Sequence, residues 1–171
     1  MSELDTLRWQ FTLVTRLAAH HLPALTDDMC LWRPAPSAWT VRQDADGNWR
    51  PDWADVEPDP APPATIGWIT WHLIWWRSSL IAAARGETPP ARESVLWPGG
   101  AAAAVAQLDS LTAEWSALLA ALTENDLDRP IAYPWAEPQP LRRALAWANL
   151  ELMKNIAEIG DMRRLYDASR G

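Results

Sequence analysis

The sequence has a single cysteine, a single phenylalanine and no excess of positive charge. One cysteine, Cys30, excludes an internal disulfide and is typical of a reducing compartment. Fifteen Lys and Arg residues against 22 Asp and Glu residues give a net charge of −7, which disfavours nonspecific binding to nucleic acid. The first residues, MSELDTLRW, lack the basic and then apolar order of a secretory signal. We therefore expect a cytoplasmic protein with no nucleic-acid partner.

One stretch has the length of a membrane span. Residues 64–84 read ATIGWITWHLIWWRSSLIAAA, close to the about 20 residues that a bilayer requires. However, His72 and Arg77 lie in its middle, where a charge is costly, and its tryptophans gather at the centre instead of at the ends. We expect a buried helix of a globular protein and no membrane partner.

Tryptophan is abundant, with 13 residues. Each indole buries a large area and carries one N–H that needs an acceptor. Two interpretations stay open: a core rich in tryptophan, or an aromatic pocket for a small organic substrate. Trp71, Trp75 and Trp76 flank His72, which favours the second interpretation slightly.

Apolar residues recur at intervals of three and four over four long segments, and this spacing predicts amphipathic helices. Thr65 is a suitable N-cap for the second helix, and Gly86 is a suitable end. The expected fold class is all-α, a four-helix bundle in one domain that spans residues 1–171. The predicted helices cover residues 3–22, 65–85, 101–122 and 141–166.

The connections between these helices are rich in proline. Residues 23–64 contain eight prolines and several tryptophans, which predicts an ordered segment that wraps the bundle. Within it, Asp46-Gly47-Asn48 predicts a turn between two short extended pieces, and we expect no other sheet. Residues 123–140 contain four more prolines. The long first and third connections leave room for a crossover.

The last predicted helix has a polar interruption in its apolar stripe. Asn155 occupies a core position, and Glu151 lies one turn before it on the same side. His72 is predicted to face inward from the second helix. A histidine and two oxygen-bearing side chains can bind a divalent metal, so His72, Glu151 and Asn155 are the candidate metal ligands, with His72 and Glu151 as candidate catalytic residues. Alternatively, His72 is a core histidine, Glu151 pairs with Lys154 or Arg143, and Asn155 makes a core polar contact.

Three stretches carry a resemblance to a known family: LPALTDDMCLWRPAPSAWTVR, TIGWITWHL and NLELMKNIAEIGDMRRLY, in this order. Together they resemble the DinB-like superfamily, which includes thiol-dependent metalloenzymes such as mycothiol-dependent maleylpyruvate isomerase. The resemblance implies a four-helix bundle with a divalent metal, often Zn or Ni. In the family, the metal ligands are a histidine on the second helix and an HxxxH or ExxxH pair on the last helix.

Carried over to this chain, the family ligands fall on His72, Glu151 and Asn155. Asn155 departs from the family pattern, and the tail that often reads HHxGE is KNIAE here. Lys154 thus stands where the family pattern has a histidine, and Glu158 retains the glutamate at the end of that pattern. An amide oxygen is a weak ligand for zinc-like metals, so we expect weak or absent metal binding. We also expect that Asn155→His raises the affinity for Zn²⁺ strongly, and His21 is a candidate substitute ligand.

Three interpretations of function stay open. The first is a thiol-dependent transferase or isomerase, in which a metal holds the thiolate of mycothiol. In that case Cys30 is a spectator, and four basic residues are candidates to hold acidic groups of the cofactor: Arg33, Arg42, Arg77 and Lys154. The second is a metal-free ligand-binding or biosynthetic protein with a Trp-lined pocket. The third is a non-catalytic bundle, with a homodimer as its assembly.

Overall fold

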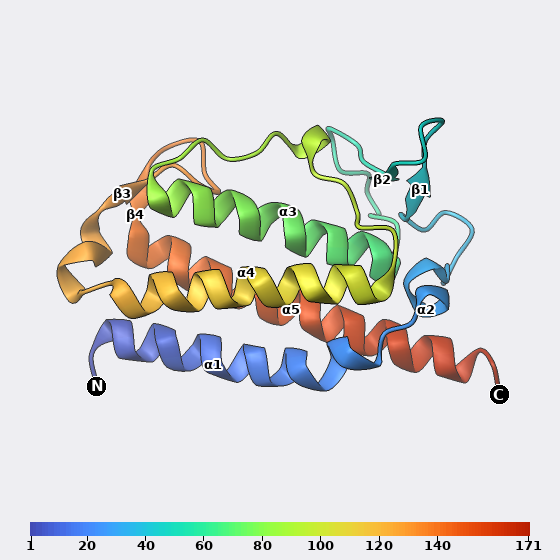
Figure 1. Cartoon of the computed structure of the whole chain (residues 1–171), viewed down its shortest axis with the longest axis horizontal. Coiled ribbons are helices and arrows are strands. Elements are labelled where there is room, and N and C mark those ends of the chain that lie inside the picture. The colour runs from blue at the N-terminus through green and yellow to red at the C-terminus, as the bar shows by residue number, and fades with distance from the viewer.

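Four long helices lie along one another in the computed structural model, which describes residues 1–171 (Figure 1). They are α1 (Glu3–His21), α3 (Ile66–Arg85), α4 (Ala101–Ala121) and α5 (Leu141–Ala168). The predicted all-α four-helix bundle is confirmed, and each helix agrees with its predicted range to within two residues. The shorter elements are η1 (Leu22–Ala24), α2 (Asp27–Leu31), β1 (Val41–Gln43), β2 (Trp49–Pro51), η2 (Arg92–Ser94), η3 (Glu124–Asp128), β3 (Pro130–Ile131) and β4 (Gln139–Pro140).

Local capping explains where α3 begins and ends. The side chain of Thr65 accepts a hydrogen bond from the backbone N–H of Trp68 at 3.3 Å, so it satisfies one of the free donors of the first turn. Gly86 follows the helix with φ of 77°, a left-handed conformation that glycine adopts without steric cost. Both predicted boundary residues are confirmed.

The helices run up, down, down and up. In Figure 1, α1 and α5 both run from left to right, whereas α3 and α4 run from right to left. At the left end, Glu124 accepts from the backbone N–H of Leu4 at 3.0 Å and Arg129 donates to the carbonyl of Ala84 at 2.9 Å. The connection that returns along the bundle is therefore residues 86–100, the second connection, and neither the first nor the third, which have room for a crossover, makes one.

The second connection, residues 86–100, is long enough to return along the whole length of a helix. A helix of 20 residues such as α3 is about 30 Å long, and 15 extended residues span up to about 50 Å. The returning segment is held at its far end, where the backbone N–H of Trp97 donates to the carbonyl of Trp49 at 3.0 Å.

The predicted ribbon within residues 23–64 is present. β1 and β2 pair antiparallel, with Val41 opposite Pro51. The turn between them is closed by the N–H of Asp44, which donates to the carbonyl of Asn48 at 2.8 Å. A second ribbon of β3 and β4 and the short helix α2 were not expected, because elements of two to five residues are too short to show a periodic pattern.

The core contains 33 buried apolar side chains contributed by all four long helices and by the connections. The predicted stripe of α5 is buried throughout: Leu141, Leu145, Ala148, Leu152, Ile159, Met162 and Tyr166. In α4 Ala104 and Leu119 are buried, whereas Val105 and Leu118 are only partly buried.

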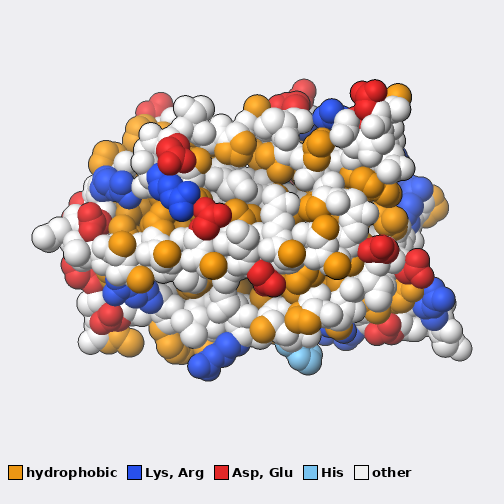
Figure 2. Space-filling view, viewed as in Figure 1, with side chains coloured by type: hydrophobic (Ala, Val, Ile, Leu, Met, Phe, Trp, Pro, Cys, Tyr) orange, Lys and Arg blue, Asp and Glu red, His pale blue; other side chains and the backbone are white.

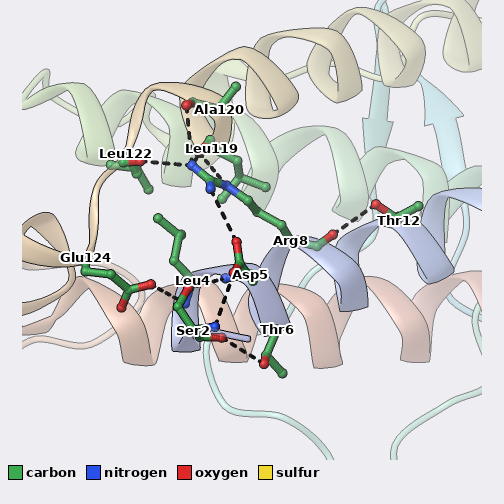
Figure 3. Close-up of polar contacts among 10 residues, drawn as sticks. All are labelled: Ser2, Leu4, Asp5, Thr6, Arg8, Thr12, Leu119, Ala120, Leu122 and Glu124. Carbon is green, nitrogen blue, oxygen red and sulfur yellow. Dashed lines mark hydrogen bonds and ion pairs between the residues drawn. The ribbon is translucent and has the colours of Figure 1, made fainter.

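At the left end of the bundle, side chains satisfy free backbone groups at the end of α4 and at the start of α1 (Figure 3). The guanidinium of Arg8, on α1, donates to the carbonyls of Leu119 at 2.8 Å, Ala120 at 3.3 Å and Leu122 at 2.9 Å. These carbonyls close α4, where a positive charge also compensates the helix dipole. At the start of α1, the backbone N–H of Leu4 donates to the carboxylate of Glu124 on η3, as described above.

Charged side chains of both signs are scattered over the face that Figure 2 shows, and they do not gather into a patch of one sign. The chain contains no helix that is both long enough and apolar enough to span a membrane.

Candidate functional site

A cavity of about 650 Å³ lies between α3 and α5, under the segment of residues 39–64. On the α5 side the cavity is lined by residues 151, 154, 158 and 161. Their spacing of three and four residues places them on one face of the helix. The lining residues are Trp39, Trp53, Ala54, Asp55, Glu57, Ala61, Pro62, Pro63, Ala64, Trp68, Ile69, His72, Glu151, Lys154, Glu158, Asp161 and Met162.

Backbone contacts hold the covering segment in place. The N–H of Trp39 donates to the carbonyl of Pro63 at 2.9 Å, and the carbonyl of Trp39 accepts from Thr65 at 2.8 Å. The indole N–H of Trp68 donates to the carbonyl of Asp52 at 2.7 Å. Gly67 permits this approach, since a Cβ there would lie 3.0 Å from the side chain of Val41 in the covering segment and 2.9 Å from the backbone oxygen of Cys30 on α2. The segment is thus fixed to the start of α3.

His72 lies in the wall of this cavity with an unsatisfied nitrogen. Its ring stacks on Trp68, with centroids 5.1 Å apart and planes 15° apart. Its Nδ1 is buried and has no hydrogen-bond partner. Burial lowers the pKa of His72 to about 4, although the carboxylate of Glu151 acts in the opposite direction. The imidazole is therefore neutral at pH 7.

The polar interruption of α5 is a closed network. The Oδ1 of Asn155 accepts from the indole N–H of Trp76 at 3.1 Å, and its Nδ2 donates to Glu151 at 3.3 Å and to Glu158 at 3.2 Å. The ammonium of Lys154 lies 3.3 Å from Glu151 and 3.4 Å from Glu158. Lysine and asparagine thus each bridge the same two carboxylates.

The carboxylates of this network keep the side chain of Lys154 protonated. Partial burial acts to lower the pKa of Lys154, but the carboxylates of Glu158 and Glu151 outweigh it, so the pKa is raised. Lys154 is therefore a cation at neutral pH and a poor nucleophile. The thiol of Cys30 is also unreactive, because it is fully buried and burial raises its pKa to about 12.

The structure brings the three candidate ligands close but does not present them as a metal site. His72 and Glu151 line one cavity, and Asn155 contacts Glu151 from the buried side. The amide orientation follows from its partners, since reversing it would place the NH₂ group against the indole N–H of Trp76. The amide oxygen therefore faces Trp76, and the NH₂ group faces the carboxylates.

Two further observations show a poor fit to a divalent metal. The ammonium of Lys154 already neutralises Glu151 and Glu158. No group of three or more His, Cys, Asp or Glu side chains is placed so that it could hold a metal ion. With Glu151 and Glu158 already paired with an ammonium, this donor set fits a divalent metal poorly.

His21 does not reach this site. Its ring lies against Gly160, where a Cβ would be 2.8 Å from the imidazole, and it contacts Arg163 at 3.2 Å. Gly160 is nine residues after Glu151, so it faces the opposite side of α5. The expectation that His21 replaces a missing ligand is therefore wrong.

Of the four basic residues considered for cofactor binding, only Lys154 lines the cavity. Arg42 pairs with Asp52 at 2.8 Å. Arg77 is buried against α4, where it donates to the carbonyl of Leu108 at 3.3 Å and to Thr112 at 3.0 Å. Arg33 is exposed and bonds within its own loop.

Sequence reasoning missed the contribution of the covering segment. Trp39 and Trp53 line the cavity from residues 39–64, together with Asp55 and Glu57. The high density of tryptophan in a proline-rich segment was the available signal. It indicated an ordered segment, but it did not indicate which helix face this segment covers.

Comparisons with known proteins agree with this architecture. A crystal structure described as "the conserved protein of locus from Enterococcus faecalis" is similar over 96% of this chain and 97% of that chain, with 14% sequence identity and a TM-score of 0.64, which shows the fold alone. No curated protein matches the sequence. The family model of the DinB superfamily matches residues 10–159. With a match over most of its length, the chain belongs to the DinB superfamily.

Proposed function

We propose that this protein binds a small organic molecule in the Trp-lined cavity, without a metal ion. The observation that carries the proposal is a cavity of about 650 Å³ lined by Trp39, Trp53 and Trp68, with His72 and Glu151 in its wall. A cavity of this volume falls within the about 300–1,000 Å³ of ligand sites.

His72 and Glu151 are the proposed polar contacts of the ligand. The neutral imidazole can accept or donate one hydrogen bond, and the carboxylate of Glu151 is held in place by Asn155 and Lys154. Any chemistry at this site would be proton transfer through this pair. With a pKa of about 4, His72 is a weak base, so its main role is to orient the ligand.

A thiol-dependent transferase or isomerase of the mycothiol type is the second candidate. It is favoured by the position of His72 and Glu151, the residues that match family metal ligands, at one cavity. The contacts of Lys154 and Asn155 weigh against it. Elemental analysis after loading with Zn²⁺ or Ni²⁺ separates the two candidates. Stoichiometric metal would favour the thiol-dependent enzyme, and substoichiometric metal would favour the metal-free site.

Indole N–H resonances provide a direct test of ligand binding. A panel of small neutral, cationic and anionic organic compounds is added to ¹⁵N-labelled protein. At least one compound should shift the resonances of Trp39, Trp53 and Trp68. Trp9, which is 56% exposed on α1, and Trp115, in the interior on α4, should not move, and they serve as internal controls. A panel in which no compound shifts the three cavity indoles would contradict the proposed function.

A further inference from the structure

We infer that the ligand of this cavity is an organic cation, either a protonated amine or a quaternary ammonium compound with a small apolar body. This inference rests on the proposed function and adds the chemical class of the ligand. Two features of the cavity support it: its charge and its tryptophan lining.

The charge of the lining favours a cation. Its one basic side chain, Lys154, faces five carboxylates, and His72 is neutral at pH 7. The carboxylates are Asp55, Glu57, Glu151, Glu158 and Asp161. A lining with this excess of negative charge raises the local concentration of cations and repels anions.

Tryptophan faces supply the second feature. Trp39, Trp53 and Trp68 line the cavity, and the ring centroid of Trp39 is 5.2 Å from that of Trp68 and 6.5 Å from that of Trp53. Indole is the aromatic group that attracts cations most strongly, and the attraction increases where water is excluded. The combination of indole faces with carboxylates suits a cation that also carries methyl or methylene groups.

The chain already holds one of its own cations in this way. The guanidinium of Arg92 lies over the ring of Trp53, 4.5 Å from its centroid, and 4.0 Å from the carboxylate of Asp55. Arg92 does not line the cavity. Trp53 and Asp55 both line the cavity, so an indole and a carboxylate of the lining already hold a cation together.

The pairing of Lys154 extends the argument from charge. An anionic ligand would have no free cation to bind, because the ammonium of Lys154 already contacts Glu151 and Glu158. A neutral ligand would leave Glu57, the lining carboxylate that forms no ion pair, without a counter-ion.

Three probes of nearly equal shape test the inference. Choline is the cation, 3,3-dimethylbutan-1-ol is its neutral carbon isostere, and 3,3-dimethylbutanoate is the anion. Their dissociation constants are measured on the full chain by titration of the Trp39 and Trp68 indole resonances. Choline should bind at least about tenfold more tightly than the neutral isostere, and the anion should bind most weakly.

Two variants change the cavity charge in opposite directions. Glu57 is exposed on the lining and forms no ion pair, so Glu57→Lys should weaken choline binding about tenfold. Asp167→Lys makes the same charge change on α5 outside the cavity and should alter it less than about twofold. Lys154→Met removes the internal cation and frees two carboxylates, so it should strengthen choline binding severalfold.

The outcomes separate this inference from the proposed function. Equal binding of choline and its neutral isostere, or tightest binding of the anion, would overturn the inference and leave the proposed function intact. Equal effects of Glu57→Lys and Asp167→Lys would also overturn it, because binding would then follow net charge alone. If none of the three probes binds, the inference fails, and the wider panel described above decides whether the proposed function fails as well.

Discussion

Asn155 is 1% exposed, yet both ends of its amide have partners. The oxygen accepts from Trp76 on α3, and the NH₂ group donates to carboxylates on its own helix. This arrangement explains why a polar residue can occupy a core position of α5, since each buried polar atom is satisfied. It also ties α3 to α5 next to the cavity.

The contacts of Lys154 change what is expected from restoring the ligand of the family. Asn155→His alone leaves an ammonium between Glu151 and Glu158, so we expect only a small gain in Zn²⁺ affinity. The double variant Asn155→His with Lys154→Met removes that cation and supplies an imidazole. At 100 times its Kd, Zn²⁺ should stabilise the double variant by about 2.7 kcal/mol. The measurement is the melting temperature with and without Zn²⁺.

The wild-type chain and Lys154→Met are the controls for this experiment. The wild type should show little change in melting temperature with Zn²⁺. Strong stabilisation of the wild type would instead support the thiol-dependent metalloenzyme. If Zn²⁺ leaves the double variant unchanged, His72 and Glu151 are not positioned as metal ligands.

His72 should make stability depend on pH. Its pKa is about 4 in the folded protein and 6.5 as the reference value, so the unfolded chain binds the proton more readily between these values. Stability should therefore fall as pH decreases from 6.5 to 4, by an amount on the order of 3 kcal/mol from this residue. Urea unfolding at several pH values measures the slope.

The variant His72→Gln isolates this contribution, because it keeps a polar side chain but does not titrate. The difference in unfolding free energy between wild type and variant should change across pH 4–6.5 and stay constant above pH 7. Parallel curves for the two proteins would show that His72 is not a neutral, buried imidazole.

At the scale of the helices, the left end of the bundle depends on a contact from α1 to the end of α4. Arg8 donates to carbonyls that end α4 (Figure 3). Arg8→Ala leaves these carbonyls without a protein donor and removes a favourable charge, so it should destabilise the fold by about 1–2 kcal/mol. Thermal or urea unfolding measures this loss.

Arg16→Ala is the matched control for the helix contact. Arg16 lies on the same helix, is exposed and forms no ion pair or side-chain hydrogen bond in the structure. Its replacement should change stability by less than about 0.5 kcal/mol. Similar losses for the two variants would mean that Arg8 does not act through the end of α4.

At the scale of the whole molecule, tryptophan side chains join the connections to the bundle. The indole of Trp71 donates to the carbonyl of Val95 at 2.7 Å, and that of Trp97 donates to Thr70 at 3.0 Å. Because these N–H groups are hydrogen-bonded and buried, they should exchange with D₂O much more slowly than the indole N–H of exposed Trp9. Time-resolved ¹H–¹⁵N spectra measure these rates. Exchange of Trp97 as fast as that of Trp9 would contradict the packing of residues 86–100 on the bundle.

Much of the fold could be predicted because it depends on local pattern. Apolar intervals of three and four located the four helices, and Thr65 and Gly86 marked the ends of α3. The interruption at Asn155 identified the polar region of α5. The route of residues 86–100 could not be predicted, because the length of a connection permits several paths and only the packing of helices against one another selects one.

The candidate site, like the fold, could be predicted from the sequence only in part. By itself the sequence determined which residues share a face of α5, since a helix of fixed period places Glu151, Lys154 and Glu158 on one side. Only the tertiary structure decided that Trp39 and Trp53 cover this face, that the amide oxygen of Asn155 turns to Trp76, and that the ammonium of Lys154 lies between two carboxylates. Covering a helix face and choosing a hydrogen-bond partner depend on groups far apart in the chain, and periodicity along one helix carries no information about them.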